Sequence, residues 1–150
     1  THALMLIESF KPEEAVEING LGIDTPRLIC FEDKGFCRYY LGVRGGAKPC
    51  EWAYLSTDTL NILRKYAGHR ISMRTLQRYA RKHELLKPKY LHKVSWRLMI
   101  QVMPREVARF MQSRLGELKI SESRYEDLLS EADEYYPKYF EHLSKLVMVN

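Results

Sequence analysis

The apolar positions of this chain change their spacing along the sequence. Residues 3–18 have helical spacing with an interruption at Pro12, because proline inside a helix loses a backbone hydrogen bond. We therefore expect a helix, a turn and a second helix there. Three short runs rich in β-branched and aromatic residues follow at 27–32, 36–43 and 50–56, separated by turns that contain glycine. This pattern predicts a three-stranded antiparallel meander.

Helical spacing resumes after the last predicted strand. A residue suited to an N-cap or a first turn stands where each new helix should begin. The predicted starts are Ser56 or Thr57, Ser72, Pro88 and Pro104. The pattern predicts an α+β fold, mainly α-helical, with a small three-stranded antiparallel sheet packed among helices. The length suits one domain over residues 1–150, and because the chain opens inside an apolar pattern we expect the C-terminal part of a longer protein.

The tyrosines of the C-terminal helical region differ in their context. Tyr135, Tyr136 and Tyr139 have amphipathic spacing within a helix, so we expect them to pack in a core. Pro137 lies among them and is expected to start or kink a final helix. These three side chains are therefore predicted to serve packing.

Tyr125 lies instead at a predicted helix start. Ser123 and Glu126 form an S-x-x-E capping box, which places Tyr125 in the first turn. A phenol at this position could project from the surface, and the amide dipoles of the helix start favour an approaching phosphate. From the residues alone, a nucleophile and a packing residue both remain open.

The composition is that of an ordinary globular protein, with 45% hydrophobic and 29% charged residues. No apolar run approaches the roughly 18 residues of a membrane helix, and the N-terminal stretch does not fit a signal peptide. We therefore expect a cytoplasmic protein without membrane contact. Cys30, Cys37 and Cys50 contain no C-x-x-C spacing, so reduced thiols are predicted. The histidines lack metal-ligand spacing, and neither a metal nor a cofactor is predicted.

The charge is unevenly distributed along the chain. Residues 61–97 contain eleven Lys or Arg against one acid, whereas residues 121–150 contain three against seven. A basic middle with an acidic flank favours a polyanionic partner, because phosphates neutralised by cations release their counterions. A solvated charged surface with no such partner is the alternative.

Two basic segments are candidates for contact with nucleic acid. Residues 71–86 could form a recognition helix, although amphipathic basic helices are common. The predicted turn at 43–49 lacks the P-loop pattern, so its Lys48 is most simply a solvated turn residue by sequence physics. The candidate DNA contacts are Arg44, Arg70, Arg74, Arg78, Lys93 and Arg97.

Residues 89–143 resemble the C-terminal catalytic domain of archaeal tyrosine recombinases, especially the integrases of spindle-shaped viruses and related plasmids. In that family a V-P opens a helix that reads roughly D-F-I-Q-G-R, the nucleophilic tyrosine follows some residues later, and a Y-x-K-Y-x-E-x-L-like tail comes next. The matching segments here are Met103-Pro104, ARFMQSR at 108–114, Tyr125 and YPKYFEHL at 136–143. The predicted meander with a lysine in its second turn, followed by basic helices, agrees with the same fold.

The resemblance implies a reaction without metal or cofactor, in which a phenol attacks a DNA phosphodiester to give a 3′-phosphotyrosine and a free 5′-hydroxyl. It implies that Tyr125 is the nucleophile and that Lys48 is the sheet-turn lysine that protonates the leaving oxygen. Lys89 falls at a position that the family fills with His or Lys, and Arg114 at one filled with His, Trp or Arg.

Two departures concern the arginines that hold the scissile phosphate in this family. Where the family has E-S-G-x-R, this chain has Glu8-Ser9-Phe10-Lys11 and offers Lys11. Where the family has K-x-x-R, it offers His92, unless a local shift lets Lys93 or Arg97 serve. Lysine lacks the bidentate fork of arginine, and histidine, with an ordinary pKa of about 6.5, is mostly neutral at pH 7.

Three hypotheses follow from the sequence. The first is a DNA strand-exchange enzyme with attenuated activity, in which Lys11, Lys89, His92 and Arg114 hold the phosphate. The second is a catalytically inactive, recombinase-derived module that still binds double-stranded DNA. The third is a helical interaction domain without a nucleic-acid partner. The resemblance also implies self-association on DNA through the C-terminal tail.

Overall fold

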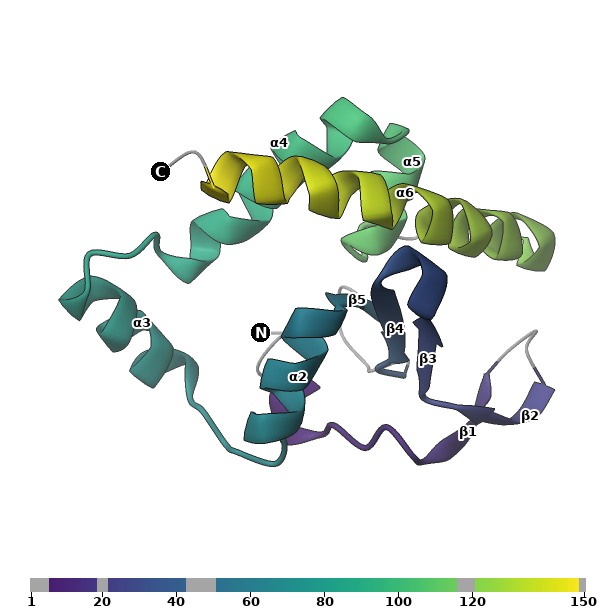
Figure 1. Cartoon of the computed structure of the whole chain (residues 1–150), viewed down its shortest axis with the longest axis horizontal. Helices are drawn as coiled ribbons and strands as arrows, with labels where there is room; N and C mark the ends of the chain where they lie inside the picture. The colour runs from purple at the N-terminus through teal and green to yellow at the C-terminus, as the bar shows by residue number, and fades with distance from the viewer. Residues whose placement is uncertain (1–5, 19–21, 43–50, 116–120, 149–150) are drawn as a thin grey trace.

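The computed structural model describes residues 6–18, 22–42, 51–115 and 121–148 (Figure 1). Its main sheet is the predicted meander, which is confirmed. Three antiparallel strands lie in sequence order, with Cys30 opposite Cys37 and Tyr39 opposite Ala53. The strands are β3 (Leu28–Phe31), β4 (Phe36–Tyr40) and β5 (Trp52–Ser56).

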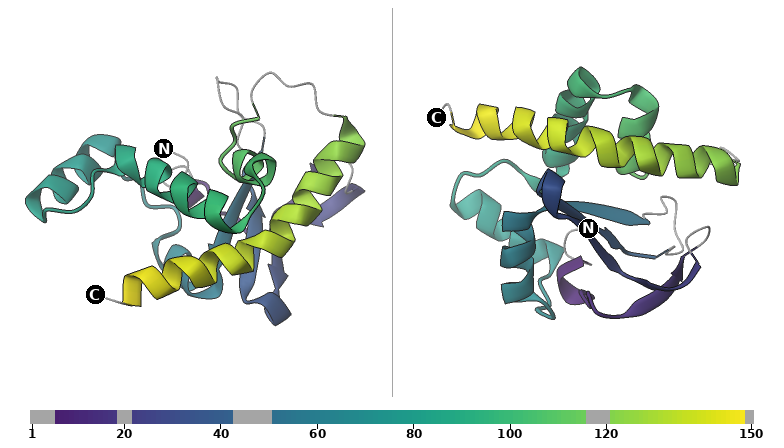
Figure 2. Two further views of the ribbon diagram at one scale, coloured as in Figure 1. Left: turned by 90° about the horizontal axis from the view of Figure 1, so that it is seen from above. Right: turned by 45° about the vertical axis from the view of Figure 1, so that its right-hand side comes forward.

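The three-stranded sheet separates two hydrophobic cores. Successive residues of a strand point to opposite faces, so β4 and β5 contribute to both cores. Phe36 and Trp52 belong to the core shared with α4, α5 and α6. Tyr39 and Leu55 belong to the core formed with α2 and the N-terminal segment. The result is a three-layer arrangement, with α6 running across one side of the sheet (Figures 1 and 2).

The helices begin where the sequence signals placed them. The Ser56 hydroxyl accepts from the Thr59 amide at 3.2 Å, and the Ser72 hydroxyl accepts from the Thr75 amide at 3.1 Å. Both are N-caps, which satisfy amides at the helix start. The predicted helices are confirmed as α2 (Thr57–Tyr66), α3 (Met73–Lys82), α4 (Pro88–Val102) and α5 (Arg105–Met111).

The last helix, α6 (Glu122–Met148), is longer than the sequence predicted. The hydroxyl of Ser121, not that of Ser123, accepts from the Arg124 amide at 3.3 Å, so the predicted capping box is wrong by two residues. No new helix starts at Pro137, which lies inside α6. Tyr136 and Tyr139 flank this proline and are both buried, which confirms their packing role. Their burial offsets the helix cost of an internal proline, which is about 3 kcal/mol.

The predicted second N-terminal helix is wrong. Residues 6–8 are helical, but the chain then forms a hairpin of two antiparallel strands, β1 (Ala15–Ile18) and β2 (Gly22–Pro26). Pro12 prevents the first helix from continuing. The sequence Asn19-Gly20 between the two strands is a typical hairpin dipeptide, and this local signal outweighs the helical spacing.

The prediction of reduced thiols is also wrong for two of the three cysteines. Cys30 and Cys37 form a disulfide between neighbouring strands of the sheet. They face each other in the β3–β4 register, which brings their sulfur atoms together. Cys50 lies outside the described residues.

Helix α3 differs from the others in how little of it is covered. Ala80 is its buried residue, and Figure 1 shows the helix extending away from the sheet. Tyr79 on α3 and Leu85 just after it are more than half exposed. Among the described residues, no helix is long and apolar enough to cross a membrane.

Candidate functional site

The phenol of Tyr125 is held by two side chains from the start of β5. Its hydroxyl donates to the carboxylate of Glu51 and accepts from the indole Nε1 of Trp52 at 2.9 Å. Its ring lies edge-on to Phe110 of α5, with 5.4 Å between ring centroids. Tyr125 is therefore half-buried and fixed at the edge of the sheet, rather than projecting from the helix start.

The surroundings of Tyr125 keep its hydroxyl protonated. Burial, followed by the hydrogen bond to Glu51 and the charge of this carboxylate, raises the pKa of Tyr125 far above its ordinary value of 10.0. Burial and then Glu51 also raise the pKa of Tyr40, while the nearby Arg27 lowers it. The neutral phenol is consequently the resting form of Tyr125.

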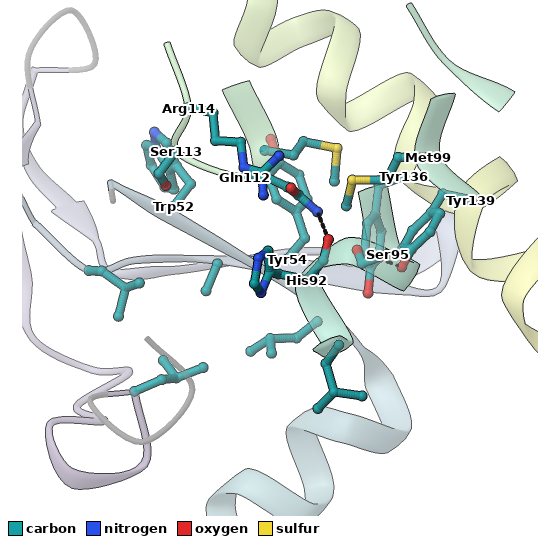
Figure 3. Close-up of a pocket in the computed structure, with 16 residues that line it drawn as sticks. Trp52, Tyr54, His92, Ser95, Met99, Gln112, Ser113, Arg114, Tyr136 and Tyr139 are labelled. Carbon is teal, nitrogen blue, oxygen red and sulfur yellow. Dashed lines mark hydrogen bonds between the residues drawn. The ribbon is translucent and has the colours of Figure 1, made fainter. Parts of the chain in front are cut away.

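A pocket of about 540 Å³ opens beside this tyrosine. Trp52, which donates to the Tyr125 hydroxyl, lines the pocket together with Arg114, His92 and Gln112 (Figure 3). The Gln112 side-chain amide donates to the backbone carbonyl of His92 at 3.0 Å. This hydrogen bond joins the end of α5, just before Arg114, to the turn of α4 that carries His92.

The backbone after α5 directs Arg114 toward the pocket. The Arg114 amide donates to the Arg109 carbonyl at 2.8 Å, and the Ser113 amide donates to the Phe110 carbonyl at 2.9 Å. Ser113 between them has a φ of 55°, in the left-handed region that favours glycine. The Arg114 guanidinium then lies 5.5 Å from the centroid of the Trp96 ring.

The position of Ser113 agrees with the family pattern described above. The family has glycine between Gln and Arg, and this chain has Ser113 between Gln112 and Arg114. The positive φ gives a physical reason for that glycine, because a side chain is strained in this conformation.

The other predicted site residues are placed differently. Lys89 and Lys93 are exposed on α4, with their Nζ atoms 4.9 and 5.8 Å from the centroid of the Tyr90 ring. Lys11 is exposed and does not line the pocket, while its backbone amide donates to the Tyr39 hydroxyl at 3.0 Å. Lys48 and Arg44 lie outside the described residues. The structure thus places His92 and Arg114 on one pocket, which Trp52 connects to Tyr125.

Arg38 in the middle of the sheet has a structural environment. Its guanidinium forms a buried ion pair with Asp133 of α6 and lies 4.9 Å from the centroid of the Trp52 ring. Burial raises the pKa of Asp133, and the charge of Arg38 opposes this effect. This pair ties α6 to β4, so Arg38 is not available to a ligand.

Arg124, directly before the candidate nucleophile, is also bound by carboxylates. It donates to Glu106 of α5 through Nε at 3.3 Å and Nη2 at 2.6 Å, and to Glu131 through Nη1 at 2.8 Å. These bonds attach the first turn of α6 to α5. They help to hold Tyr125 in place, and they occupy the guanidinium.

The candidate DNA-contacting residues within the described ranges are exposed. They are Arg70, Arg74, Arg78, Lys93 and Arg97. Arg70 lies 3.5 Å from the carboxylate of Glu8. Arg74 and Arg78 of α3 have no carboxylate partner among the residues that the structure describes.

Three residues around Tyr125 and Tyr40 were not predicted from the sequence: Glu51, Trp52 and Arg27. Glu51 follows Lys48 by three positions and directly precedes β5, so it stands at the strand end next to the lysine turn. This closeness in sequence to a candidate site residue is the one local signal that could have found it. Its pairing with Tyr125 spans 74 positions, which no spacing rule predicts.

Within the described ranges, no three His, Cys, Asp or Glu side chains are arranged to hold a metal ion. No curated protein and no solved structure gives a significant match to the chain. The family model described as archaeal phage integrase matches residues 14–142, which include Tyr125, His92 and Arg114. The chain therefore belongs to the archaeal phage integrase family.

Proposed function

We propose that this chain is a tyrosine recombinase that cleaves and rejoins double-stranded DNA through Tyr125. Its family indicates an integrase-like recombinase function. The observation that carries the proposal is the position of Trp52, which donates to the Tyr125 hydroxyl and also lines the pocket that contains Arg114 and His92. A phosphate in this pocket would lie beside both a nucleophile and cationic donors.

In the proposed reaction, the Tyr125 oxygen bonds to phosphorus while the bond from phosphorus to the 5′-oxygen breaks. Arg114 stabilises the negative charge on the non-bridging oxygens, as a preorganised donor does in other phosphoryl and acyl transfers. His92 contributes a further N–H donor, and Lys48 protonates the leaving 5′-oxygen. Rejoining is the reverse attack by a 5′-hydroxyl on the phosphotyrosine.

Lys89 and Lys11 have secondary roles in this proposal. Lys89 stands on the first turn of α4, one helical turn before His92, where it can add charge near the incoming backbone. Lys11 lies before residue 14, where the family match begins, and it does not line the pocket. In this proposal, Lys11 therefore contacts the phosphate only after DNA has bound.

A second candidate function is a recombinase-derived module that binds DNA without cleaving it. The observation in its favour is that, among the described residues that line the pocket, Arg114 is the single arginine. If each missing donor costs roughly 10²- to 10³-fold in rate, a site without the two phosphate-holding arginines of the family would be strongly attenuated. The two functions share DNA binding and differ in covalent chemistry.

The DNA surface in this proposal is formed by α3 and the start of α4. Arg74, Arg78, Lys93 and Arg97 are exposed there, and Arg44 and Arg70 add to the basic charge. We also expect molecules to associate on DNA through the C-terminal tail, where Leu146 is 48% exposed. Earlier parts of α6 pack within the same chain, as the 2.9 Å hydrogen bond between His142 and Gln101 indicates. A reaction on genomic or viral DNA would take place in the cytoplasm.

The test uses duplex DNA with a 5′-bridging phosphorothiolate, which traps the covalent intermediate because the 5′-thiol leaves and does not rejoin. Wild-type protein is expected to give a protein–DNA band on a denaturing gel, and Tyr125→Phe none. Tyr135→Phe, which removes a hydroxyl from the same helix, is the matched control and should keep the band. If the wild type shifts DNA in a native gel but forms no covalent band, the binding module is the correct function.

A further inference from the structure

The hydroxyl of Tyr125 is oriented by two partners of opposite kind. Glu51 accepts its proton in a hydrogen bond, and the Trp52 indole donates to one of its lone pairs at 2.9 Å. A phenol oxygen has one proton and two lone pairs. The second lone pair has no donor among the described residues, so it is the one that can attack phosphorus.

The position of Glu51 decides where the proton of Tyr125 can go. The phenol must lose this proton during attack, because a neutral phenol is a weak nucleophile and a protonated product oxygen would leave again. Burial and the charge of Glu51 disfavour ionisation of Tyr125 before DNA binds. The proton therefore has to leave while the new bond forms, to a group that is already in hydrogen-bond contact. Glu51 is that group.

We propose that Glu51 is the general base for cleavage by Tyr125 and the general acid for rejoining. The inference rests on the proposed function above. In cleavage, the Tyr125 oxygen forms its bond to phosphorus, its proton passes to the Glu51 carboxylate, and the bond to the 5′-oxygen breaks as this oxygen takes a proton from Lys48. In rejoining, the 5′-hydroxyl attacks, its proton returns to Lys48, and the Tyr125 oxygen leaves with the proton held by Glu51.

The charge balance of the site supports this role. A carboxylate beside a phosphate is repulsive, and the repulsion grows in the transition state unless the carboxylate is neutralised. Proton transfer removes the charge of Glu51 as charge develops on the phosphorane oxygens. Arg114 lines the pocket that Trp52 shares with this site, and Arg27, paired with Glu14 at 3.4 Å, acts on Tyr40, whose pKa Glu51 also raises.

The arrangement also explains why an indole stands on the other side. The Trp52 N–H fixes the rotation of the phenol hydroxyl, so that its proton points to Glu51. An indole can donate but cannot accept, and it therefore never competes with Glu51 for this proton.

The test is the single-turnover cleavage rate of the phosphorothiolate duplex between pH 5.5 and 10, for wild type and Glu51→Gln. Glutamine keeps an acceptor oxygen for the Tyr125 hydroxyl but cannot take its proton. At pH 7 we expect the rate of Glu51→Gln to fall about 10²- to 10⁴-fold, which is the usual contribution of a general base. The mutant rate should then rise tenfold per pH unit toward the wild-type rate, because its phenol must ionise first.

Glu126→Gln is the matched control, since it removes an exposed carboxylate from the same turn as Tyr125. It should cleave at the wild-type rate with the wild-type pH profile. DNA affinity and the thermal midpoint of Glu51→Gln are measured alongside, and both should stay near those of the wild type.

Three results would overturn the inference, and they point to different failures. Cleavage by Glu51→Gln within threefold of wild type shows that this carboxylate takes no proton in the reaction. A slow mutant whose pH profile matches wild type shows a purely structural role for Glu51. Absence of covalent product from wild type and from Glu126→Gln removes the proposed function itself, and Glu51 as its base with it.

Discussion

Helix α3 and the contact between α6 and the sheet both contain arginines, but the two regions differ in what surrounds the charges. Arg74 and Arg78 of α3 are exposed and have no carboxylate partner within the described ranges. Arg38 of the sheet is buried against Asp133, and Arg124 of α6 binds Glu106 and Glu131.

This difference separates cations that hold the fold from cations that can bind a polyanion. A guanidinium already bound to a carboxylate would have to lose that partner before it could bind a phosphate, whereas an exposed, unpaired one only exchanges water and counterions. Net charge by segment does not reveal this distinction. The carboxylate partners across the fold do reveal it, because among the described residues they leave Arg74 and Arg78 of α3 exposed and free for the proposed contact with DNA.

The largest loss of stability is expected where buried Arg38 is left without its carboxylate partner, Asp133. Asp133→Ala should lower the free energy of unfolding by about 3–5 kcal/mol, because it leaves Arg38 charged and buried. Urea denaturation measures the loss. The double variant Arg38→Met/Asp133→Leu, which removes both charges and keeps similar volume, should recover most of it. A loss below about 1 kcal/mol in Asp133→Ala would show that the pair does not anchor α6.

In α3, substitution of the arginines is expected to lower DNA affinity and to leave stability unchanged. The double variant Arg74→Ala/Arg78→Ala should leave stability within about 0.5 kcal/mol of wild type, as surface substitutions usually do. Its DNA affinity should fall about 10- to 100-fold. The slope of log affinity against log salt is negative, and its magnitude should become smaller by about 2. Fluorescence anisotropy at several salt concentrations measures both quantities.

The matched control for this variant is Arg105→Ala/Lys138→Ala, which removes two exposed cations outside the basic segment. Its affinity should stay near that of wild type. An equal loss of affinity in the two double variants would mean that total charge, and not the position of α3, determines DNA binding.

Arg114 belongs to neither group, because a turn rather than an ion pair holds it in place. Ser113→Gly should raise the free energy of unfolding by about 0.5–1 kcal/mol, since glycine accepts the positive φ without strain. Ser123→Gly is the contrasting variant, because this exposed serine lies within α6, where glycine is unfavourable by about 0.5 kcal/mol. A destabilised Ser113→Gly would indicate that the hydroxyl or the reduced backbone freedom of Ser113 matters more than the strain.

The parts of the fold that the sequence predicted correctly depend on local signals. The meander follows from alternation and turn residues. Ser56 and Ser72 mark helix starts through hydrogen bonds within one turn, and Pro88 and Pro104 mark them through the fixed φ of proline. The N-terminal hairpin was missed because helical spacing was given more weight than the dipeptide Asn19-Gly20. The disulfide was missed because it depends on the register between two strands.

The residues of the candidate site also divide into those that a sequence pattern indicates and those that only a distant contact reveals. Tyr125, His92 and Arg114 were found because they lie in a stretch that resembles a known pattern. Glu51 and Trp52 were not found, because their importance comes from a contact with a helix more than seventy positions away, which the sequence does not display. From its helix position, Tyr125 could have projected or packed, and only its contacts with Glu51 and Trp52 show that it is held.

The placement of the two tryptophans has a practical consequence for following this protein in solution. The chain has Trp52 and Trp96 and no other tryptophan. The first touches the Tyr125 hydroxyl and the second faces the Arg114 guanidinium. Intrinsic emission excited at the red edge of the indole band, where DNA does not absorb, therefore originates entirely beside the proposed reaction centre. Binding and release of DNA at this site can therefore be followed by the intrinsic tryptophan fluorescence, without an added dye.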